Sequence, residues 1–268
     1  MPTDTLFEII EETADFLVVN KTGDLVCHPT KGDAYSSLIG RLRLYYANQP
    51  NVKPSFVNRL DRETSGVVLI AKHPVAHKTL QRQFDQRRVS KRYLAIVEGI
   101  PATDGGTIDQ PIGREPGSVV IIKQAVIPDG MPSVTHWKKL GEGTGVTLLE
   151  VQPETGRLHQ IRVHLSSIGH PIVGDKIYGP DPLFYLEFAK NGWNHMLEKR
   201  LKTRRQMLHA VEMGISDETG IRQWKAPVPE DMRAFWEVWC SEGGMRSAEV
   251  FLEKISCSKS LYTSPVRE

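Results

Sequence analysis

The sequence predicts an α+β fold. Strand-like apolar runs and helical segments follow one another along 268 residues without the regular βαβ rhythm of a doubly wound sheet. Hydrophobic residues make up 40% and charged residues 25%, which are ordinary values for a globular protein. A chain of this length can bury a large core without disulfide bonds.

The first third predicts two strands and two helices. Residues 16–20 form a short apolar run, and residues 66–71 are rich in β-branched side chains, so both are predicted strands. Residues 36–48 carry apolar side chains at helical spacing. Pro74 suits the first turn of a second helix, which is expected to end near Arg88.

The middle of the chain predicts mainly strands. Residues 92–98 alternate between polar and apolar side chains, as a strand does. Residues 101–133 are rich in glycine and proline and contain a strand-like run at 118–122. Residues 134–140 and 146–151 are expected to pair as antiparallel neighbours.

The last third predicts helices. Ile161, Leu165 and Ile168 repeat at helical spacing, and Gly169 stands where a helix C-cap is expected. A further helix is expected over residues 230–240. One domain is therefore predicted over residues 1–240, with residues 181–206 as a helical basic insertion and residues 241–268 as a polar C-terminal tail.

Charge and cysteine content exclude several classes of protein. The net charge of +2 is smaller than that of proteins that coat nucleic acid nonspecifically, so any RNA contact must use local basic patches. The cysteines, Cys27, Cys240 and Cys257, are sparse and far apart, which argues against a disulfide framework and a thiolate zinc site. No signal peptide and no apolar run of about 18 residues is present, so a cytoplasmic location without membrane contact is expected.

Residues 58–66 concentrate charge just before a predicted strand. Asp61 lies between Arg59 and Arg62, and neighbouring cations lower the pKa of a carboxyl group. An ionised aspartate can act as a nucleophile or a base without a metal. The alternative is a structural turn in which Asp61 forms a salt bridge.

A second polar cluster begins a predicted helix at residues 154–165. Arg157, His159 and Arg162 gather at the N-terminal end of this helix, where anions are favoured. His159 and His164 are five residues apart, about 140° around a helix, so a zinc site is not expected. His164 is better explained as a hydrogen-bonded core residue.

Together with Tyr93 on its predicted strand, these segments resemble the RluA-type RNA pseudouridine synthases. The resemblance covers about residues 10–235 and is carried by residues 15–21, 26–29, 59–62, 64–66 and 91–95, and most strongly by 155–157, 159–162, 169–175 and 178–179. It implies a bent, mainly antiparallel mixed sheet with flanking helices and a central catalytic cleft. It also implies isomerisation of specific uridines to pseudouridine in ribosomal RNA or transfer RNA.

The resemblance implies roles for particular residues. Asp61 matches the catalytic aspartate, Arg162 the arginine that pairs with it, and Tyr93 the tyrosine that stacks near the target base and accepts a proton. Arg59 matches the arginine that replaces the flipped nucleotide in the RNA stack. Asn58 departs from the family, in which histidine is common at this position.

The remaining RNA contacts are expected from basic residues. Arg62, Lys91, Arg157 and His159 are candidate substrate-binding residues. For Tyr93 the alternative is a core ring at the edge of the sheet, which a lone tyrosine would favour. Further candidates for phosphate contacts, with a solvated helix face as the alternative, are Arg82, Arg87, Arg88, Arg92 and the basic cluster at 199–205.

The reaction involves no redox change, so no cofactor and no metal are expected, with RNA as the partner of a monomer. Many relatives begin with an S4 RNA-binding domain, whereas this sequence starts near the catalytic motif. RNA selection is therefore expected to rest on the catalytic domain. An RNA-binding module without catalysis and a metal-dependent nuclease are the alternatives. The intact Asp61 argues against the first, and the absence of a carboxylate cluster against the second.

Overall fold

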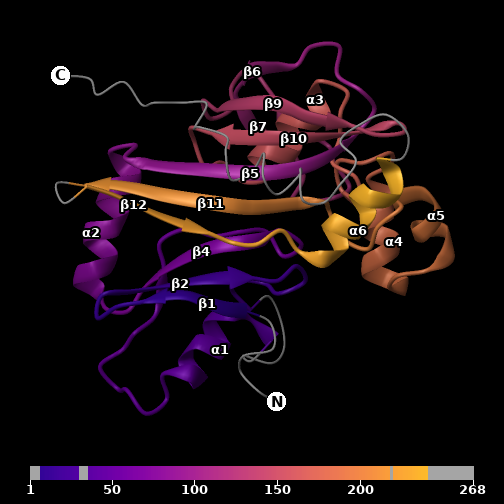
Figure 1. The fold of residues 1–268 in the computed structure, drawn as a ribbon. Helices are drawn as coiled ribbons and strands as arrows, with labels where there is room; N and C mark the ends of the chain where they lie inside the picture. Colours follow the sequence, from indigo (N-terminus) through magenta and orange to yellow (C-terminus); the bar gives the residue numbers. More distant parts are fainter. Residues whose placement is uncertain (1–6, 30–35, 218–219, 241–268) are drawn as a thin grey trace. The chain divides into compact units, whose positions relative to one another are not determined.

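The computed structural model describes residues 7–29, 36–217 and 220–240 (Figure 1). The predicted tail at 241–268 lies outside the described residues. The chain divides into two compact units. Unit 1 comprises Met1–Lys91 and His209–Pro229, and unit 2 comprises Arg92–Leu208 and Glu230–Glu268.

Unit 1 is built on a mixed sheet. Its strands are β1 (Phe7–Glu12), β2 (Phe16–Lys21), β3 (Ser55–Phe56), β4 (Ser65–Ala71), β11 (Leu208–Asp217) and β12 (Gly220–Lys225). The order is β1-β2-β4-β11-β12, and β3 pairs with β4. Every pair is antiparallel except β4 with β11, which run parallel.

Helices α1 (Leu38–Tyr45) and α2 (Pro74–Asp85) complete unit 1. Pro74 occupies the first turn of α2, as predicted, and the His73 ring caps the helix by accepting the Ala76 N–H. The core of the sheet contains alternate residues of β4, which pack with Trp224 and with the partly buried Leu80 and Phe84 of α2. A continuously apolar β4 is expected for a strand buried on both faces.

Unit 2 contains an antiparallel sheet of order β5-β10-β9-β6 and a separate hairpin. The sheet strands are β5 (Val89–Glu98), β6 (Gly105–Asp109), β9 (Val134–Glu142) and β10 (Val146–Pro153), and the hairpin strands are β7 (Ile112–Arg114) and β8 (Gln124–Val126). The first three residues of β5 belong to unit 1. The helices are α3 (Gln160–Ser167), α4 (Leu183–Asn191), α5 (His195–Leu201) and α6 (Glu230–Trp239).

The α+β class is confirmed, and the pairing of residues 134–140 with 146–151 is confirmed as β9 and β10. The predicted strand at 118–122 is wrong, because these residues form turns between β7 and β8. Only Val120 of this run is buried, in a cluster with Val163 and Tyr178, while Val119 and Ile121 are exposed.

Residues 181–206 form two helices rather than one helical stretch. Gly192 ends α4 at a positive φ of 72°, and the Asn194 side chain then caps α5 by accepting the Leu197 N–H. Whether this segment is an insertion, and whether residues 1–240 act as one domain, remain predictions.

Gly66 is required by the close approach of β4 and β11. Its φ is +114°, and a Cβ atom built there would lie 2.2 Å from the Ala210 carbonyl oxygen. Gly66→Ala is therefore expected to lower the free energy of unfolding by about 3 kcal/mol, measured by urea denaturation.

Gly145→Ala is the matched control, since Gly145 has a φ of +71° but nothing lies within 4 Å of the position that a Cβ atom would take there. This control is expected to lose only about 1 kcal/mol. Equal losses in both variants would show that the contact with β11 contributes nothing.

Candidate active site

The segment that carries Asp61 is a turn between β3 and β4 in unit 1. Leu60 is buried, Asp61 is half-buried, and Arg59 and Arg62 are exposed. The Thr64 N–H donates to the Asp61 carbonyl oxygen at 3.2 Å, which closes the turn. The turn thus holds its apolar residue inward and both arginines toward solvent.

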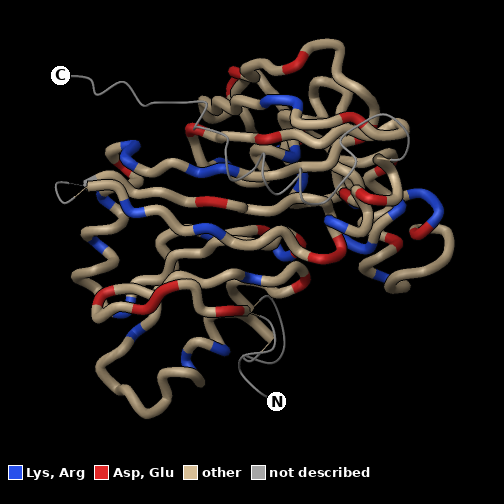
Figure 2. The backbone as a smooth tube through the Cα atoms, in the orientation of Figure 1, with Lys and Arg blue, Asp and Glu red and all other residues tan. Residues whose placement is uncertain are grey.

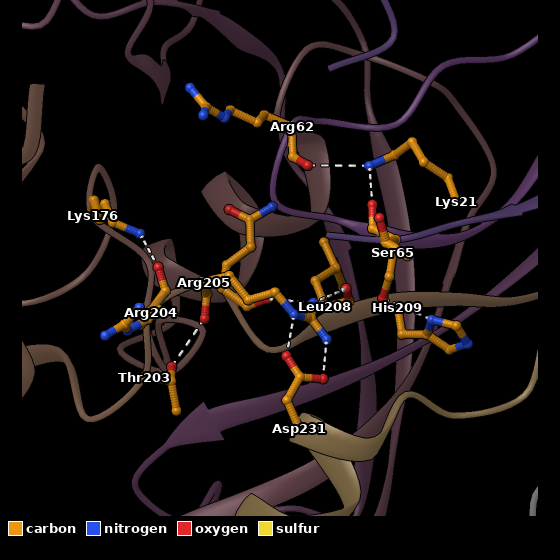
Figure 3. Close-up of polar contacts among 12 residues, drawn as sticks. Lys21, Arg62, Ser65, Lys176, Thr203, Arg204, Arg205, Leu208, His209 and Asp231 are labelled. Atoms are coloured by element: carbon orange, nitrogen blue, oxygen red, sulfur yellow. Dashed lines mark hydrogen bonds and ion pairs between the residues drawn. The ribbon is translucent and has the colours of Figure 1, made fainter. Parts of the chain in front are cut away.

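A buried lysine anchors this turn. Lys21, at the end of β2, has no exposed surface. Its ammonium group donates to the carbonyl oxygens of Thr22 and Leu25 at 2.8 and 2.9 Å. It also donates to the Arg62 carbonyl oxygen at 3.1 Å (Figure 3). Burying an ammonium ion is costly unless such dipoles replace its water. The Arg62 carbonyl, next to Asp61, is therefore fixed to β2.

Two more contacts hold the first half of the turn. The Asn58 side-chain oxygen accepts the Leu69 N–H at 2.7 Å, and the Cys27 thiol donates to the Leu60 carbonyl oxygen at 3.4 Å. Burial raises the pKa of the Cys27 thiol, which keeps it protonated as a donor. Asn58, the residue that departs from the family pattern, therefore has a structural contact in this chain.

The second half of the turn is attached to β11. Ser65 Oγ lies 2.9 Å from His209 Nδ1 (Figure 3). His209 Nε2 lies 3.3 Å from the Ala226 carbonyl oxygen. A carbonyl can only accept, so Nε2 carries a proton, and in the neutral ring Nδ1 then accepts from the Ser65 hydroxyl. This contact fixes the register in which His209 pairs with Ser65 and Ala210 with Gly66.

Strand β5 carries Lys91 and Tyr93, two residues apart. Tyr93 is 9% exposed and pairs with Val151 of β10. Burial lowers the pKa of Lys91 to about 8. Arg92, between them, is buried in an ion pair with Glu150 at 3.3 Å, so it serves the fold rather than a phosphate.

Arg162 on α3 forms a buried pair with a residue that the sequence analysis did not single out. Its Nε and Nη2 atoms donate to Asp175 Oδ2 and Oδ1 at 2.7 and 2.9 Å. Asp175 Oδ1 also accepts the backbone N–H groups of Ile177 and Tyr178 at 2.9 and 3.0 Å. Burial raises the pKa of Asp175, but the charge and hydrogen bonds of Arg162 and the two N–H groups outweigh it and lower that pKa overall.

Tyr178 links several parts of this cluster. The Arg162 guanidinium carbon lies 4.9 Å from the centre of the Tyr178 ring. The Tyr178 hydroxyl accepts the Gln124 N–H at 2.9 Å and lies 2.8 Å from His159 Nδ1. His159 begins α3 with a left-handed backbone, at a φ of 57°.

The loop before α3 is held by its own polar side chains. Gln160 Oε1 accepts from the Thr155 hydroxyl at 2.7 Å and from the Arg157 N–H at 3.0 Å. Arg157 Nε donates to the Pro132 carbonyl oxygen at 3.2 Å. The structural interpretation of His164 is confirmed: it is buried and contacts Thr135 Oγ1 and the Gln110 carbonyl oxygen.

Two of the five basic residues in the cluster at 199–205 form structural ion pairs. Lys202 pairs with Glu98 at 2.5 Å, and Arg205 pairs with Asp231 through two contacts of 2.5 and 2.8 Å. The exposed members are Lys199, Arg200 and Arg204. Figure 2, in the orientation of Figure 1, shows blue Lys and Arg colouring in the region of α5. These three are the cluster's remaining candidates for phosphate contacts.

The predicted site residues are distributed over both units. Unit 1 holds Asp61, Arg59, Arg62 and Lys91, and unit 2 holds Tyr93, Arg157, His159 and Arg162. The meeting of Asp61 with Tyr93 and Arg162 remains a prediction. Sequence reasoning assigned no role to Lys21, Asp175, Tyr178 or His209. The first three lie in segments that carry the family resemblance, which was the available signal.

Metal sites and membrane spans are both lacking in the part of the chain that the structure describes. Within residues 7–29, 36–217 and 220–240, no group of three or more His, Cys, Asp or Glu side chains could hold a metal ion. Across the same ranges, no helix is long and apolar enough to cross a membrane.

Comparison with known proteins identifies the family. The family model of RNA pseudouridylate synthase matches residues 15–167, which include Asp61, Tyr93 and Arg162. An uncharacterized RNA pseudouridine synthase of Chloroflexus aurantiacus is 40% identical over 80% of this chain and 63% of the relative. The ribosomal large subunit pseudouridine synthases D of Pasteurella multocida and Haemophilus influenzae are 36% and 37% identical over 86% and 83% of this chain, and 70% and 68% of their own length.

Solved structures agree with this assignment. Human RNA pseudouridylate synthase domain containing 1 has a TM-score of 0.71 and 27% identity, and the comparison covers 96% of this chain and 97% of that one. Human RNA pseudouridylate synthase domain containing 4 has a TM-score of 0.65 and 25% identity over 84% and 89% of the two chains. The chain belongs to the RNA pseudouridylate synthase family, a class of isomerases that act on RNA.

The anchoring role of Lys21 can be tested by Lys21→Met. This change removes the ammonium group and leaves buried carbonyl oxygens without their donor. We expect the free energy of unfolding in urea to fall by about 2–4 kcal/mol. The control is Lys53→Met, at an exposed position, which is expected to change it by less than about 0.5 kcal/mol. A stable Lys21→Met variant would contradict the anchoring role.

Proposed function

We propose that this protein isomerises specific uridines to pseudouridine in structured RNA, with Asp61 as the catalytic carboxylate. The observation that carries the proposal is the family match, which spans Asp61, Tyr93 and Arg162 in one continuous segment. The anchoring of the Asp61 turn by Lys21, Asn58 and Ser65 supports it, because a catalytic group must be held in a fixed geometry.

The reaction breaks the N1–C1′ bond of uridine and joins C5 of the ring to C1′. Substrate and product are isomers: N1 gains a proton and C5 loses one. Asp61 assists departure of the base, either as a nucleophile on the sugar or as a base. After the ring has rotated, Tyr93 accepts the C5 proton. Neither step requires a cofactor.

A uridine within a stacked helix must be extruded before Asp61 can reach it, at a cost of a few kcal/mol. In this proposal, the exposed Arg59 occupies the vacated position in the stack and offsets part of this cost. Arg62, Lys91, Arg157 and His159 contact the RNA around the extruded nucleotide. Phosphate contacts of this kind make binding dependent on salt concentration.

Large-subunit ribosomal RNA is the first substrate to test, because the relatives from P. multocida and H. influenzae carry that function in their names. Transfer RNA is the second. The purified protein is incubated with unmodified transcripts of each, and pseudouridines are mapped by carbodiimide treatment and primer extension. New pseudouridines are expected with the wild-type protein and none with Asp61→Asn.

The Asp61→Asn variant should still bind the RNA, because only the reacting carboxylate is altered. Pseudouridine formation that is unchanged in this variant would defeat the assignment of Asp61. Absence of any new pseudouridine in both RNA classes with the wild-type protein would defeat the proposed activity.

Tyr93→Phe separates the two functions proposed for this residue. The ring is retained, so stacking and RNA affinity should stay within about threefold of wild type, while loss of the hydroxyl should lower kcat by about 10²-fold or more. Single-turnover rates and filter-binding affinities provide the two measurements. A wild-type kcat would exclude Tyr93 as the proton acceptor.

A further inference from the structure

We propose that Asp175 and Tyr178 are positioning residues that fix the orientation of Arg162 for the catalytic carboxylate. This inference rests on the proposed function, in which Arg162 pairs with Asp61. Asp175 occupies one edge of the guanidinium group, formed by Nε and Nη2. A guanidinium group has five N–H donors in a rigid plane, so fixing one edge also fixes the directions of the remaining donors.

Asp175 is itself held rigidly. Its Oδ1 atom accepts two backbone N–H groups in addition to Arg162, and its own carbonyl oxygen accepts the Gly179 N–H at 3.0 Å. A carboxylate with this many donors has one favourable rotamer. The fixed carboxylate group of Asp175 therefore also fixes the guanidinium group of Arg162 that is bonded to it.

The residues on either side of Asp175 lock its backbone. Gly174 has a φ of +80°, and a Cβ atom there would lie 2.2 Å from the Arg205 carbonyl oxygen and from Thr203 Oγ1. Lys176 donates to the Arg204 carbonyl oxygen at 2.5 Å (Figure 3). The segment at 203–205 therefore packs against both neighbours of Asp175.

Tyr178 sets the plane of the guanidinium. Its ring lies beneath Arg162, while its backbone N–H donates to Asp175, so one residue holds both members of the pair. Its hydroxyl is bonded to the Gln124 N–H on the β7–β8 hairpin and contacts His159. Movement of the ring would break these contacts as well.

The negative charge of Asp175 has a second effect, on the reactivity of the catalytic carboxylate. An arginine paired with one carboxylate lowers that carboxyl group's pKa strongly and makes it a weaker base and nucleophile. An arginine already shared with Asp175 neutralises a second carboxylate less completely. In this arrangement Asp175 both aims Arg162 and limits how far it reduces the reactivity of Asp61.

The test is Asp175→Asn in the full chain, with the RNA identified by the mapping experiment. Because Asn has nearly the same shape but no charge, kcat is expected to fall by about 10–100-fold while KM for RNA stays within about threefold. In an Arg162→Gln background, Asp175→Asn is expected to cause no further loss, since it acts through Arg162.

The matched control is Glu142→Gln, which removes the negative charge from the Lys139–Glu142 ion pair of the same unit. Glu142 has no part in holding Arg162 or Asp175, so only Asp175→Asn should lower kcat. Equal losses of kcat would show a general structural effect and overturn the inference. So would additive losses in Asp175→Asn with Arg162→Gln.

If Asp175→Asn does not fold, the Tyr178→Leu variant tests the positioning of Arg162 instead. It keeps the backbone N–H that holds Asp175 but removes the ring beneath Arg162, so kcat should fall by about 10-fold with little change in KM. A wild-type kcat in this variant would overturn the inference while leaving the proposed function intact. A wild-type protein that forms no pseudouridine would overturn both.

Discussion

The ion pair between Arg162 and Asp175 is the interaction on which the candidate active site of unit 2 depends. Both side chains are buried, and a buried pair is only weak evidence for stability because removing two charges from water is costly. Its geometry instead favours a role in orientation. Two hydrogen bonds to Asp175 and the Tyr178 ring hold the Arg162 guanidinium group, and two backbone N–H groups hold Asp175 in turn.

In unit 1, the turn that carries Asp61 is held in place by a lysine rather than by an arginine–carboxylate pair. Lys21 is buried and donates to three backbone carbonyl oxygens, one of them that of Arg62, so the main chain of the turn is attached to the end of β2. Asn58 and Ser65 hold the two ends of the same turn. In both units, then, a buried cation holds a segment of the candidate site through hydrogen bonds.

The sequence predicted what depends on local patterns. The β-branched run of β4, the proline that starts α2 and the glycine that ends α3 could each be recognised within a few residues. The run at 118–122 was wrongly predicted as a strand. Val120 is the one buried residue of this run, and it packs with Val163 and Tyr178, which lie more than 40 positions away in the chain. The contacts of Lys21 with Arg62 and of Ser65 with His209 join equally remote residues, so no local pattern reveals them. Asp61 itself was singled out by family resemblance, since composition favoured a simple turn.

The parallel pairing of β4 with β11 also bears on biosynthesis. Unit 1 combines residues 1–91 with the β11–β12 ribbon, which follows residue 208 much later in the chain. On the ribosome, β2 and β3 can pair with β4 early, but Ser65 and Gly66 at the start of β4 lack their β11 partners until the whole intervening segment is translated. Unpaired strand edges invite aggregation. Chaperone protection during this interval would matter more for this chain than for one whose sheets close in the order of synthesis.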